Sequence, residues 1–329
     1  MKKLLLYFGL FILIVFCLPI IFTNEFKTEQ VLSEDIANNL NENNIDFDYG
    51  NFNDINLLHI DTGEVETLKL DNYLYGVVAA EMPASYEKEA LKAQAVVART
   101  YTIYKIKNGS KHENADICDS SLCCQAWISK ENRFARWEEN KAEEYWNKIV
   151  LAINETKGKI ATYNGEPINA FFHSNSGGKT ELPINVWGGE YPYLQVVSTS
   201  GEEIYSSYNS EIIISKDELI AKMLEKYSKF EIDFEKEDCI KIIGKTEGER
   251  VKKIKVGNTE ISGIEARSIF SLKSAKFEIK LEGDNIIFEV IGYGHGVGLS
   301  QSGSDALAKN GKKYDEIIKY YYKDVEISE

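Results

Sequence analysis

The sequence has 329 residues, and its 43% hydrophobic and 27% charged residues are typical of a globular protein rather than a disordered one. Its 52 acidic residues outnumber its 38 lysines and arginines, which gives a formal net charge of -14. Because such a chain repels the phosphates that supply most nucleic-acid affinity, nucleic acid is excluded as a partner.

An apolar N-terminal segment follows Lys2 and Lys3. It runs uncharged from Leu4 to Phe22, and at about 1.5 Å per residue it is long enough for a bilayer core of about 30 Å. A secretory signal peptide is the alternative, but no small-residue cleavage site follows the run. The pattern therefore favours an uncleaved membrane anchor at residues 1–23, with the N-terminus in the cytoplasm and the rest of the chain outside.

Residues 24–56 are rich in Asn, Asp and Glu and show no regular period, so they are predicted to form an acidic tether. A folded domain is expected over residues 57–329, with a second lobe at about residues 204–288. Because helical and strand patterns are mixed along it, the predicted fold class is α+β. The expected architecture is an N-terminal transmembrane helix followed by a two-lobed extracytoplasmic domain with a substrate groove.

Helices and turns are predicted in order along the folded domain. A helix capped by Asp71 stops before Pro83, because proline disfavours continuation, and Ser85 caps a longer helix that ends at Asn108-Gly109. The later elements are a cysteine-bearing loop over 110–129, a helix ended by Lys157-Gly158, a hairpin turn at Asn164-Gly165, a helix near 216–227, a glycine-rich loop over 292–298 and two short C-terminal helices.

Glu81 is the first candidate for chemistry. It lies near the end of an apolar helix, with Val77 and Val78 on the preceding turn. A carboxyl group among apolar side chains has a raised pKa, as a general acid near neutral pH requires. The alternative is an exposed acid at a helix end.

Three long motifs extend this picture. The first comprises the runs AEMP (80–83) and EALKAQAVVARTY (89–101), the second is FHSNSGGKT (172–180), and the third is GYGHGVGLSQSG (292–303). Together they resemble the stage II sporulation protein D family, also called amidase enhancers. The cysteine-bearing loop resembles that of clostridial, zinc-containing members.

The resemblance implies a peptidoglycan lytic transglycosylase, a lyase that cleaves denuded glycan strands during engulfment in sporulation and leaves 1,6-anhydromuramic ends. Glu81 matches the family's catalytic acid, and Arg99 and Lys179 match residues that the family requires. The implied partners are glycan strands, an amidase of the stage II sporulation protein P type and a membrane protein of the stage II sporulation protein M type. The implied location is a single-pass membrane protein with its catalytic domain on the extracytoplasmic side of the sporulation septum.

A set of side chains is predicted to bind the glycan. Ser174 and its two neighbours offer donors for sugar hydroxyls, and the planar guanidinium of Arg99 could hold a muramyl lactate carboxylate. The alternatives are a surface ion pair for Arg99, a core position for Tyr191 and a packed histidine in a tight turn for His295. The predicted binding residues are Gln94, Arg99, Ser174, Asn175, Ser176, Lys179, Tyr191 and His295.

A histidine and three cysteines in one short loop indicate a metal site. The thiolates of Cys118 and Cys124 with the imidazole of His112 suit one zinc ion, which prefers tetrahedral sulfur and nitrogen ligation. We expect Cys124 rather than Cys123 as the ligand and a structural role for the zinc, with the fourth ligand open. A disulfide, favoured outside the membrane, and free thiols are the alternatives.

Two rival functions are compatible with the same residues. One is a non-catalytic, glycan-binding activator of a cell-wall amidase. The other is a zinc-dependent cell-wall hydrolase, against which two thiolate ligands would leave the zinc a weaker Lewis acid than histidines would.

Overall fold

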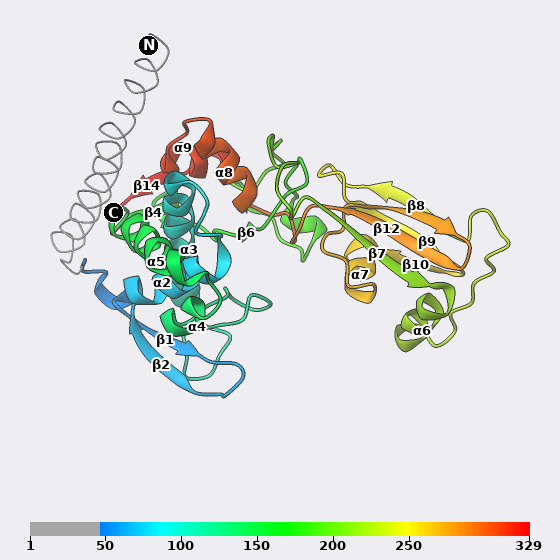
Figure 1. The fold of residues 1–329 in the computed structure, drawn as a ribbon, viewed down its shortest axis with the longest axis horizontal. Helices are drawn as coiled ribbons and strands as arrows, with labels where there is room; N and C mark the ends of the chain where they lie inside the picture. Colours follow the sequence, from blue (N-terminus) through cyan, green and yellow to red (C-terminus); the bar gives the residue numbers. More distant parts are fainter. Residues whose placement is uncertain (1–46) are drawn as a thin grey trace, which may run out of the picture. The chain divides into compact units, whose positions relative to one another are not determined.

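The computed structural model describes residues 47–329, which form helices and small sheets around two separate hydrophobic cores (Figure 1). No helix among these residues is both long enough and apolar enough to cross a bilayer. The predicted fold class is corrected accordingly: the described residues are α+β, and a transmembrane helix is not among their elements. The anchor predicted at residues 1–23 and most of the predicted tether lie outside the described residues.

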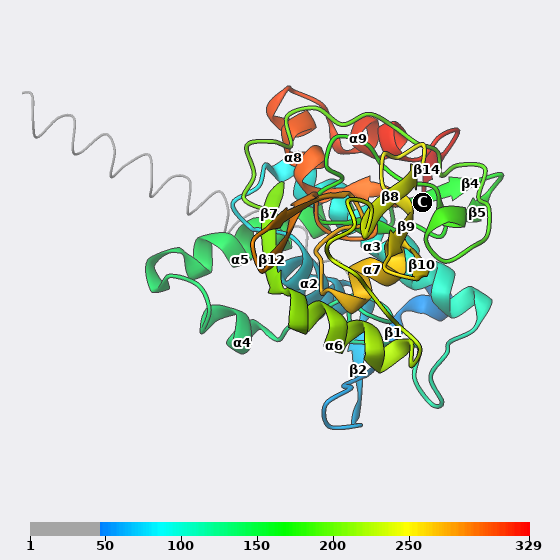
Figure 2. The same ribbon diagram turned by 90° about the vertical axis from the view of Figure 1, so that its right-hand side faces the viewer.

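The elements around the larger core form what we call the first lobe. Helix α3 (Lys88–Asn108) lies at its centre and contacts four other helices (Figure 2). Because α3 is buried on nearly every side, its alanines and valines fill the interior and let its neighbours approach closely. The other elements are η1 (Gly50–Phe52), β1 (Asp54–Leu58), β2 (Val65–Lys69), α2 (Leu70–Glu81), β3 (Ile117–Cys118), α4 (Lys130–Phe134), α5 (Glu139–Asn154), β4 (Ile160–Tyr163), β5 (Glu166–Pro167), β6 (Phe172–His173), η2 (Pro183–Asn185), β13 (Leu299–Ser300), α8 (Gln301–Lys309), α9 (Tyr314–Tyr321) and β14 (Glu326–Ser328).

Three small sheets complete the first lobe. Strand β1 pairs antiparallel with β2 and parallel with β3, so the cysteine-bearing loop is tied to the first strand of the lobe. Strand β4 lies between β5 and the C-terminal strand β14, and β6 pairs in parallel with β13. The last pairing brings two of the sequence motifs together, because β6 begins the 172–180 motif and β13 lies within the 292–303 motif.

The helix boundaries correct two predicted caps. Lys69 precedes α2 as its N-cap and Asp71 lies inside the first turn, whereas Glu87 rather than Ser85 precedes α3. The helix ends agree better with the sequence: α2 ends at Glu81, and α3 ends at Asn108 before Gly109, whose φ is 89°. The hairpin turn predicted at Asn164-Gly165 joins β4 to β5.

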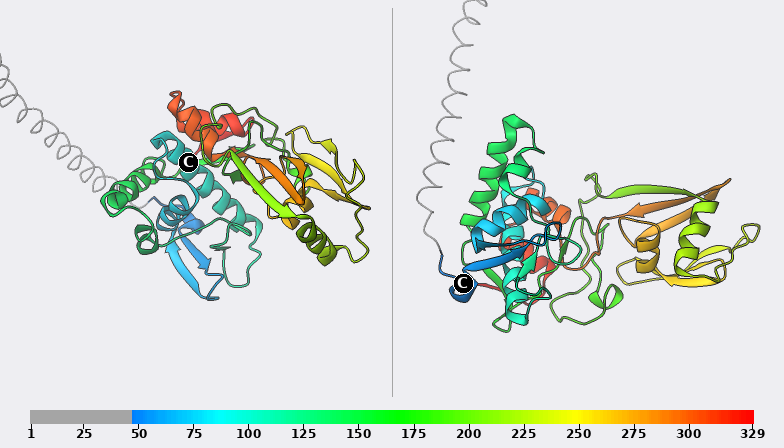
Figure 3. Two further views of the ribbon diagram at one scale, coloured as in Figure 1. Left: turned by 45° about the vertical axis from the view of Figure 1, so that its right-hand side comes forward. Right: turned by 90° about the horizontal axis from the view of Figure 1, so that it is seen from below.

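The second lobe surrounds the smaller core. It contains two antiparallel three-stranded sheets, β11-β12-β7 and β10-β9-β8, with two helices that follow β7 and β10 (Figure 3). Serine caps begin both helices, and the second has a complete capping box between Ser262 and Glu265. The elements are β7 (Asn209–Ser215), α6 (Lys216–Lys226), β8 (Ile240–Lys245), β9 (Val251–Val256), β10 (Thr259–Ser262), α7 (Gly263–Ile269), β11 (Phe277–Glu282) and β12 (Asn285–Ile291).

Candidate functional site

Glu81 is the last residue of α2, and its side chain is half-buried. The backbone N–H of Ala126 donates to its Oε1 at 2.6 Å, and the side chain of Gln301 also hydrogen-bonds to it. Burial outweighs these two bonds and raises the pKa of Glu81 from 4.5 to about 7. The negative end of the α2 dipole acts in the same direction. This carboxyl group can therefore lose and regain a proton near neutral pH.

Gln94 and Gln301 lie together beside this carboxyl group. Both are buried, and the Nε2 of Gln301 donates to the Oε1 of Gln94 at 3.4 Å. Because Gln94 is fully buried, its predicted contact with a glycan is not supported by its position. It orients Gln301, which in turn bonds to Glu81.

The nearest acids along the chain do not pair with Glu81. Glu89 binds the Nζ of Lys92 at 3.0 Å and the backbone N–H of Tyr314 at 3.0 Å, while Glu87 is exposed. Among the described residues, no second carboxylate is hydrogen-bonded to Glu81. The site therefore presents one carboxyl group with a raised pKa.

Arg99 does not reach the surface, so its position does not support its predicted role in substrate binding. Its side chain has 0% exposure, and its guanidinium donates to the carbonyl oxygen of Thr156 at 2.8 Å and to Asp71 at 3.3 Å. Asp71 lies in the first turn of α2, whereas Glu81 lies at the opposite end of that helix. Arg99 thus joins α2 to the end of α5 inside the lobe.

Asn175 and Ser176 of the 172–180 motif, which were predicted to bind sugar, are also buried. The hydroxyl of Ser176 donates to Glu202 at 2.6 Å, and the Nδ2 of Asn175 donates to the carbonyl oxygen of Glu202 at 3.4 Å and to Ser207 at 3.3 Å. Their burial does not support the expectation that both residues contact a glycan. Ser174 is half-buried, so it is the residue of this trio with an accessible side chain.

Glu202 is a buried residue that the sequence analysis missed. Its carboxylate has no exposed area and accepts from the backbone N–H groups of Ser176 at 3.2 Å and Gly178 at 3.0 Å, and from hydroxyls that include Thr199 at 2.7 Å. Ser300 donates to Oε1, the oxygen that also accepts from the N–H of Ser176. So many donors satisfy a buried charge and hold the two glycine-containing motifs in one arrangement. Its place in an acidic, polar stretch gave no sign of burial.

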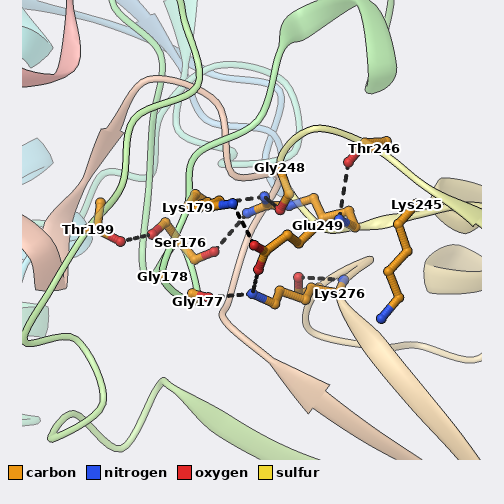
Figure 4. Close-up of polar contacts among 12 residues, drawn as sticks. Ser176, Gly177, Gly178, Lys179, Thr199, Lys245, Thr246, Gly248, Glu249 and Lys276 are labelled. Atoms are coloured by element: carbon orange, nitrogen blue, oxygen red, sulfur yellow. Dashed lines mark hydrogen bonds and ion pairs between the residues drawn. The ribbon is translucent and has the colours of Figure 1, made fainter.

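Lys179 lies where the 172–180 motif meets the second lobe (Figure 4). Its Nζ is 2.6 Å from Glu249, and Lys276 contacts the same carboxylate at 2.8 Å while donating to the carbonyl oxygen of Gly177 at 2.8 Å. These two ammonium groups lower the pKa of Glu249 to about 2. With 37% of its side chain exposed, Lys179 remains accessible to a ligand as well.

The glycine-rich loop packs against an arginine of the second lobe. Arg250 is buried and donates to the carbonyl oxygens of Ser176 at 3.0 Å and Lys179 at 3.1 Å. A Cβ at Gly296, whose φ is 84°, would lie 2.0 Å from its guanidinium nitrogen. This glycine therefore permits close packing of the arginine against the loop.

Two hydrogen bonds to the backbone hold the imidazole ring of His295 in place. Its Nδ1 accepts from the backbone N–H of Val297 at 3.0 Å, and the ring also bonds to the backbone of Phe172. Burial and the neighbouring His173, with ring centroids 5.6 Å apart, lower its pKa well below the usual value. His295 is therefore a neutral, packed histidine, which is the alternative that the sequence had left open.

Tyr191 belongs to a group of rings that we call the aromatic cluster. It contacts Phe171 at a centroid distance of 6.0 Å, and its hydroxyl accepts from the Nδ2 of Asn169 at 3.4 Å. The ring is half-buried, so it combines packing with partial access. The aromatic cluster consists of Phe171, Trp187, Tyr191 and His295.

The structure brings His112 and three cysteines together. One ligand atom from each lies within 4.8 Å of the others, and the Nε2 of His112 is 3.5 Å from the sulfur of Cys123 and 3.6 Å from that of Cys124. The sulfurs of Cys123 and Cys124 are 3.8 Å apart, and all four cysteines in the described part are free thiols. Cys123, which was expected to be a bystander, is therefore a full member of the group with Cys118.

These spacings fit a tetrahedral zinc site. Zinc binds sulfur at about 2.3 Å and nitrogen at about 2.0–2.1 Å, which places tetrahedral ligands about 3.5–3.8 Å apart. The three separations among His112, Cys123 and Cys124 match that range. The donor set therefore suits zinc, and Cys123 would supply the fourth donor, which the sequence had not identified.

Comparison with known proteins gives one consistent result. Residues 59–163 match the family described as Stage II sporulation protein. The chain is 36% identical over 268 residues to the stage II sporulation protein D of Bacillus subtilis (strain 168), and the match covers 80% of this chain and 76% of that protein. The protein of the same name from Bacillus amyloliquefaciens is 34% identical over the same shares. The amidase enhancer of Bacillus subtilis is 28% identical over 76% of this chain and 39% of its own length.

Proposed function

The chain belongs to the stage II sporulation protein D family, and from this premise we propose that it is a peptidoglycan lytic transglycosylase. Its substrate would be the bond between N-acetylmuramic acid and N-acetylglucosamine in denuded glycan strands. The observation that supports this activity is the position of Glu81, a half-buried carboxyl group with a pKa of about 7 and no carboxylate partner among the described residues. The clostridial, zinc-containing type stays a prediction.

The proposed mechanism uses Glu81 twice. As an acid it gives its proton to the glycosidic oxygen while the bond to C1 of the muramic residue breaks. As a carboxylate it then takes the proton of the C6 hydroxyl, whose oxygen bonds to C1 and closes the 1,6-anhydro ring. A pKa near 7 suits a group that must serve in both forms. Hydrolysis with two carboxylates normally needs a second acid about 5–9.5 Å away.

We further propose one structural zinc ion held by His112, Cys118, Cys123 and Cys124. When bound, zinc would cross-link the loop by four ligand bonds. The loop continues through Gln125, whose Nε2 donates to Tyr73 at 3.0 Å, into Ala126, whose N–H holds Glu81. These residues position the carboxyl group, so we assign the zinc no part in proton transfer.

The proposed setting is the extracytoplasmic side of the sporulation septum, where glycan strands are available. The proposed protein partners are an amidase of the stage II sporulation protein P type and a membrane protein of the stage II sporulation protein M type. The likeness to a protein named amidase enhancer supports a link to an amidase, and it also supports the rival function of a non-catalytic activator.

Mass spectrometry of denuded glycan strands treated with the purified protein tests the proposal. Anhydromuramic ends are expected with the wild type and with Glu87→Gln, which changes an exposed acid at the start of the next helix, α3. Glu81→Gln should lose at least 10³-fold in rate, in the order of a general acid's contribution of about 10²–10⁴. If no variant cuts the strands while all of them bind glycan and stimulate an amidase, the protein is an activator.

A further inference from the structure

Trp187 is the most accessible ring of the aromatic cluster. It is 46% exposed, whereas the other three tryptophans of the chain are half-buried. Two rings support it from inside: its centroid is 4.7 Å from Phe171 and 5.1 Å from His295, which it meets nearly perpendicularly at 78°. An indole that is fixed by its neighbours yet half open to solvent offers a rigid, flat surface to a ligand.

The other members of the cluster are less able to contact a ligand. The nitrogens of His295 are engaged by Val297 and Phe172, so this ring supports Trp187 rather than donating outward. Phe171 is half-buried beneath it. Tyr191 is half-buried, and its hydroxyl accepts from the Nδ2 of the buried Asn169.

The cluster is linked to the candidate catalytic group through Phe171. The carbonyl oxygen of Phe171 accepts from the backbone N–H of Leu299 at 3.0 Å. Gln301, two residues further along the chain, hydrogen-bonds to the carboxyl group of Glu81. A short run of contacts therefore joins the rings that support the indole to Glu81, and a ligand that contacts both must be extended.

We propose that Trp187 is the stacking platform of a sugar subsite next to Glu81, and that it binds the apolar face of one pyranose ring of the glycan. This inference rests on the proposed function, because it takes the glycan as the ligand. Pyranose rings carry C–H groups on one face and hydroxyls at the rim, so an aromatic surface beside polar acceptors is complementary to them. The fixed, exposed indole would set the register of the strand relative to Glu81.

Binding of denuded glycan strands, measured in a Glu81→Gln background, separates the subsite from catalysis. Trp187→Ala should weaken binding about tenfold or more, as loss of a central aromatic anchor does, and Trp187→Phe should lose less. Glycan addition should also shift the tryptophan emission of the parent, and this shift should vanish in Trp187→Phe even where calorimetry still detects binding. Tyr320→Ala, an exposed ring on α9, is the matched control and should bind as the parent does.

The outcomes distinguish the two proposals. If the parent binds glycan and Trp187→Ala binds equally well, or if the emission shift persists in Trp187→Phe, the subsite is wrong and the proposed activity is untouched. If Trp187→Ala binds weakly while Tyr320→Ala does not, the subsite is supported. If the parent neither binds nor, with Glu81 restored, cuts the strands, the proposed function fails and the subsite fails with it.

Discussion

The backbone N–H of Ala126 donates a 2.6 Å hydrogen bond to the carboxylate of Glu81, and Ala126 lies two residues after Cys124 of the cysteine group. The end of helix α2 is thereby fastened to a loop that has few other regular contacts, since β3 contributes only Ile117 and Cys118 to a sheet. Order in this loop and the position of the carboxyl group are therefore coupled.

Replacement of Cys123 tests whether the zinc site has four protein ligands. Cys123→Ser should lower zinc affinity by at least tenfold and lower the melting temperature, because a thiolate ligand is lost. Metal content by mass spectrometry and thermal unfolding are the measurements. Cys239→Ser, in a buried thiol outside the group, is the matched control and should keep about one zinc per chain. Full zinc affinity in Cys123→Ser would return this residue to the role of bystander.

The raised pKa of Glu81 predicts a pH dependence of stability in the wild type that Glu81→Gln lacks. Because the folded protein binds this proton up to about pH 7 and the unfolded chain only to about 4.5, wild-type stability falls as pH rises between these values. At about 1.36 kcal/mol per pKa unit the loss is at most about 3 kcal/mol. Glu81→Gln should therefore be more stable than the wild type at pH 8. Below pH 4.5 the variant should have no such advantage.

Denaturant unfolding of both proteins at several pH values measures this difference. The rate of strand cleavage should fall as pH rises above about 7, since the acid form of Glu81 is then depleted. A difference in stability that is constant from pH 4 to pH 8 contradicts the raised pKa. Glu87→Gln serves as the reference, because that acid is exposed.

Arg99 is predicted to be required for folding and not for substrate contact. Arg99→Met should cost about 3–5 kcal/mol, because it leaves Asp71 and several carbonyl groups without their buried donor. Arg99→Lys should be milder, since an ammonium replaces part of the donor set. Urea unfolding and Michaelis kinetics on the remaining folded fraction are the measurements. An unchanged stability together with a large increase in KM would restore the substrate role suggested by the sequence.

Sequence patterns predicted local features of this protein better than they predicted which side chains reach the surface. The end of α3 at Gly109 and the turn at Asn164-Gly165 were identified correctly, because each depends on a backbone conformation that glycine favours. The group of His112 with three cysteines was also expected, although the inclusion of Cys123 needed the folded loop.

Burial of polar residues could not be predicted from the same patterns. Ser176 and Arg99 carry the chemistry of ligand-binding residues, but their partners Glu202 and Thr156 lie far along the chain and became known only with the fold. The same holds for Trp187, which stands in a loop without periodic pattern and gains its support from Phe171 and His295. Residue type indicates possible chemistry, whereas access depends on tertiary contacts.

Ser176 is predicted to support the glycine-containing motifs through Glu202. Ser176→Ala removes one charge-assisted hydrogen bond from a carboxylate that keeps several others, so a loss of about 1–3 kcal/mol is expected, with little change in glycan affinity. Ser174→Ala, in the half-buried residue of the same segment, should change stability by about 0.5 kcal/mol or less. Thermal unfolding and glycan-binding calorimetry measure both effects. A large loss of affinity in Ser176→Ala with unchanged stability is the contrary result.

Lys179 and Glu249 allow a test of whether the lysine acts on the substrate or only pairs with the second lobe. An ion pair with 37% and 46% exposed side chains contributes about 0.2–1 kcal/mol, so neither Lys179→Ala nor Glu249→Gln should unfold the protein. If Lys179 contacts the glycan, Lys179→Ala should lose cleavage activity by about tenfold or more while Glu249→Gln keeps it, because the released ammonium remains in place. If the pair itself is what matters, both variants should lose activity equally, and the double variant should be no worse than either. Steady-state cleavage rates of the three variants, with Lys276→Ala as the control that removes the other cation from Glu249, distinguish these cases.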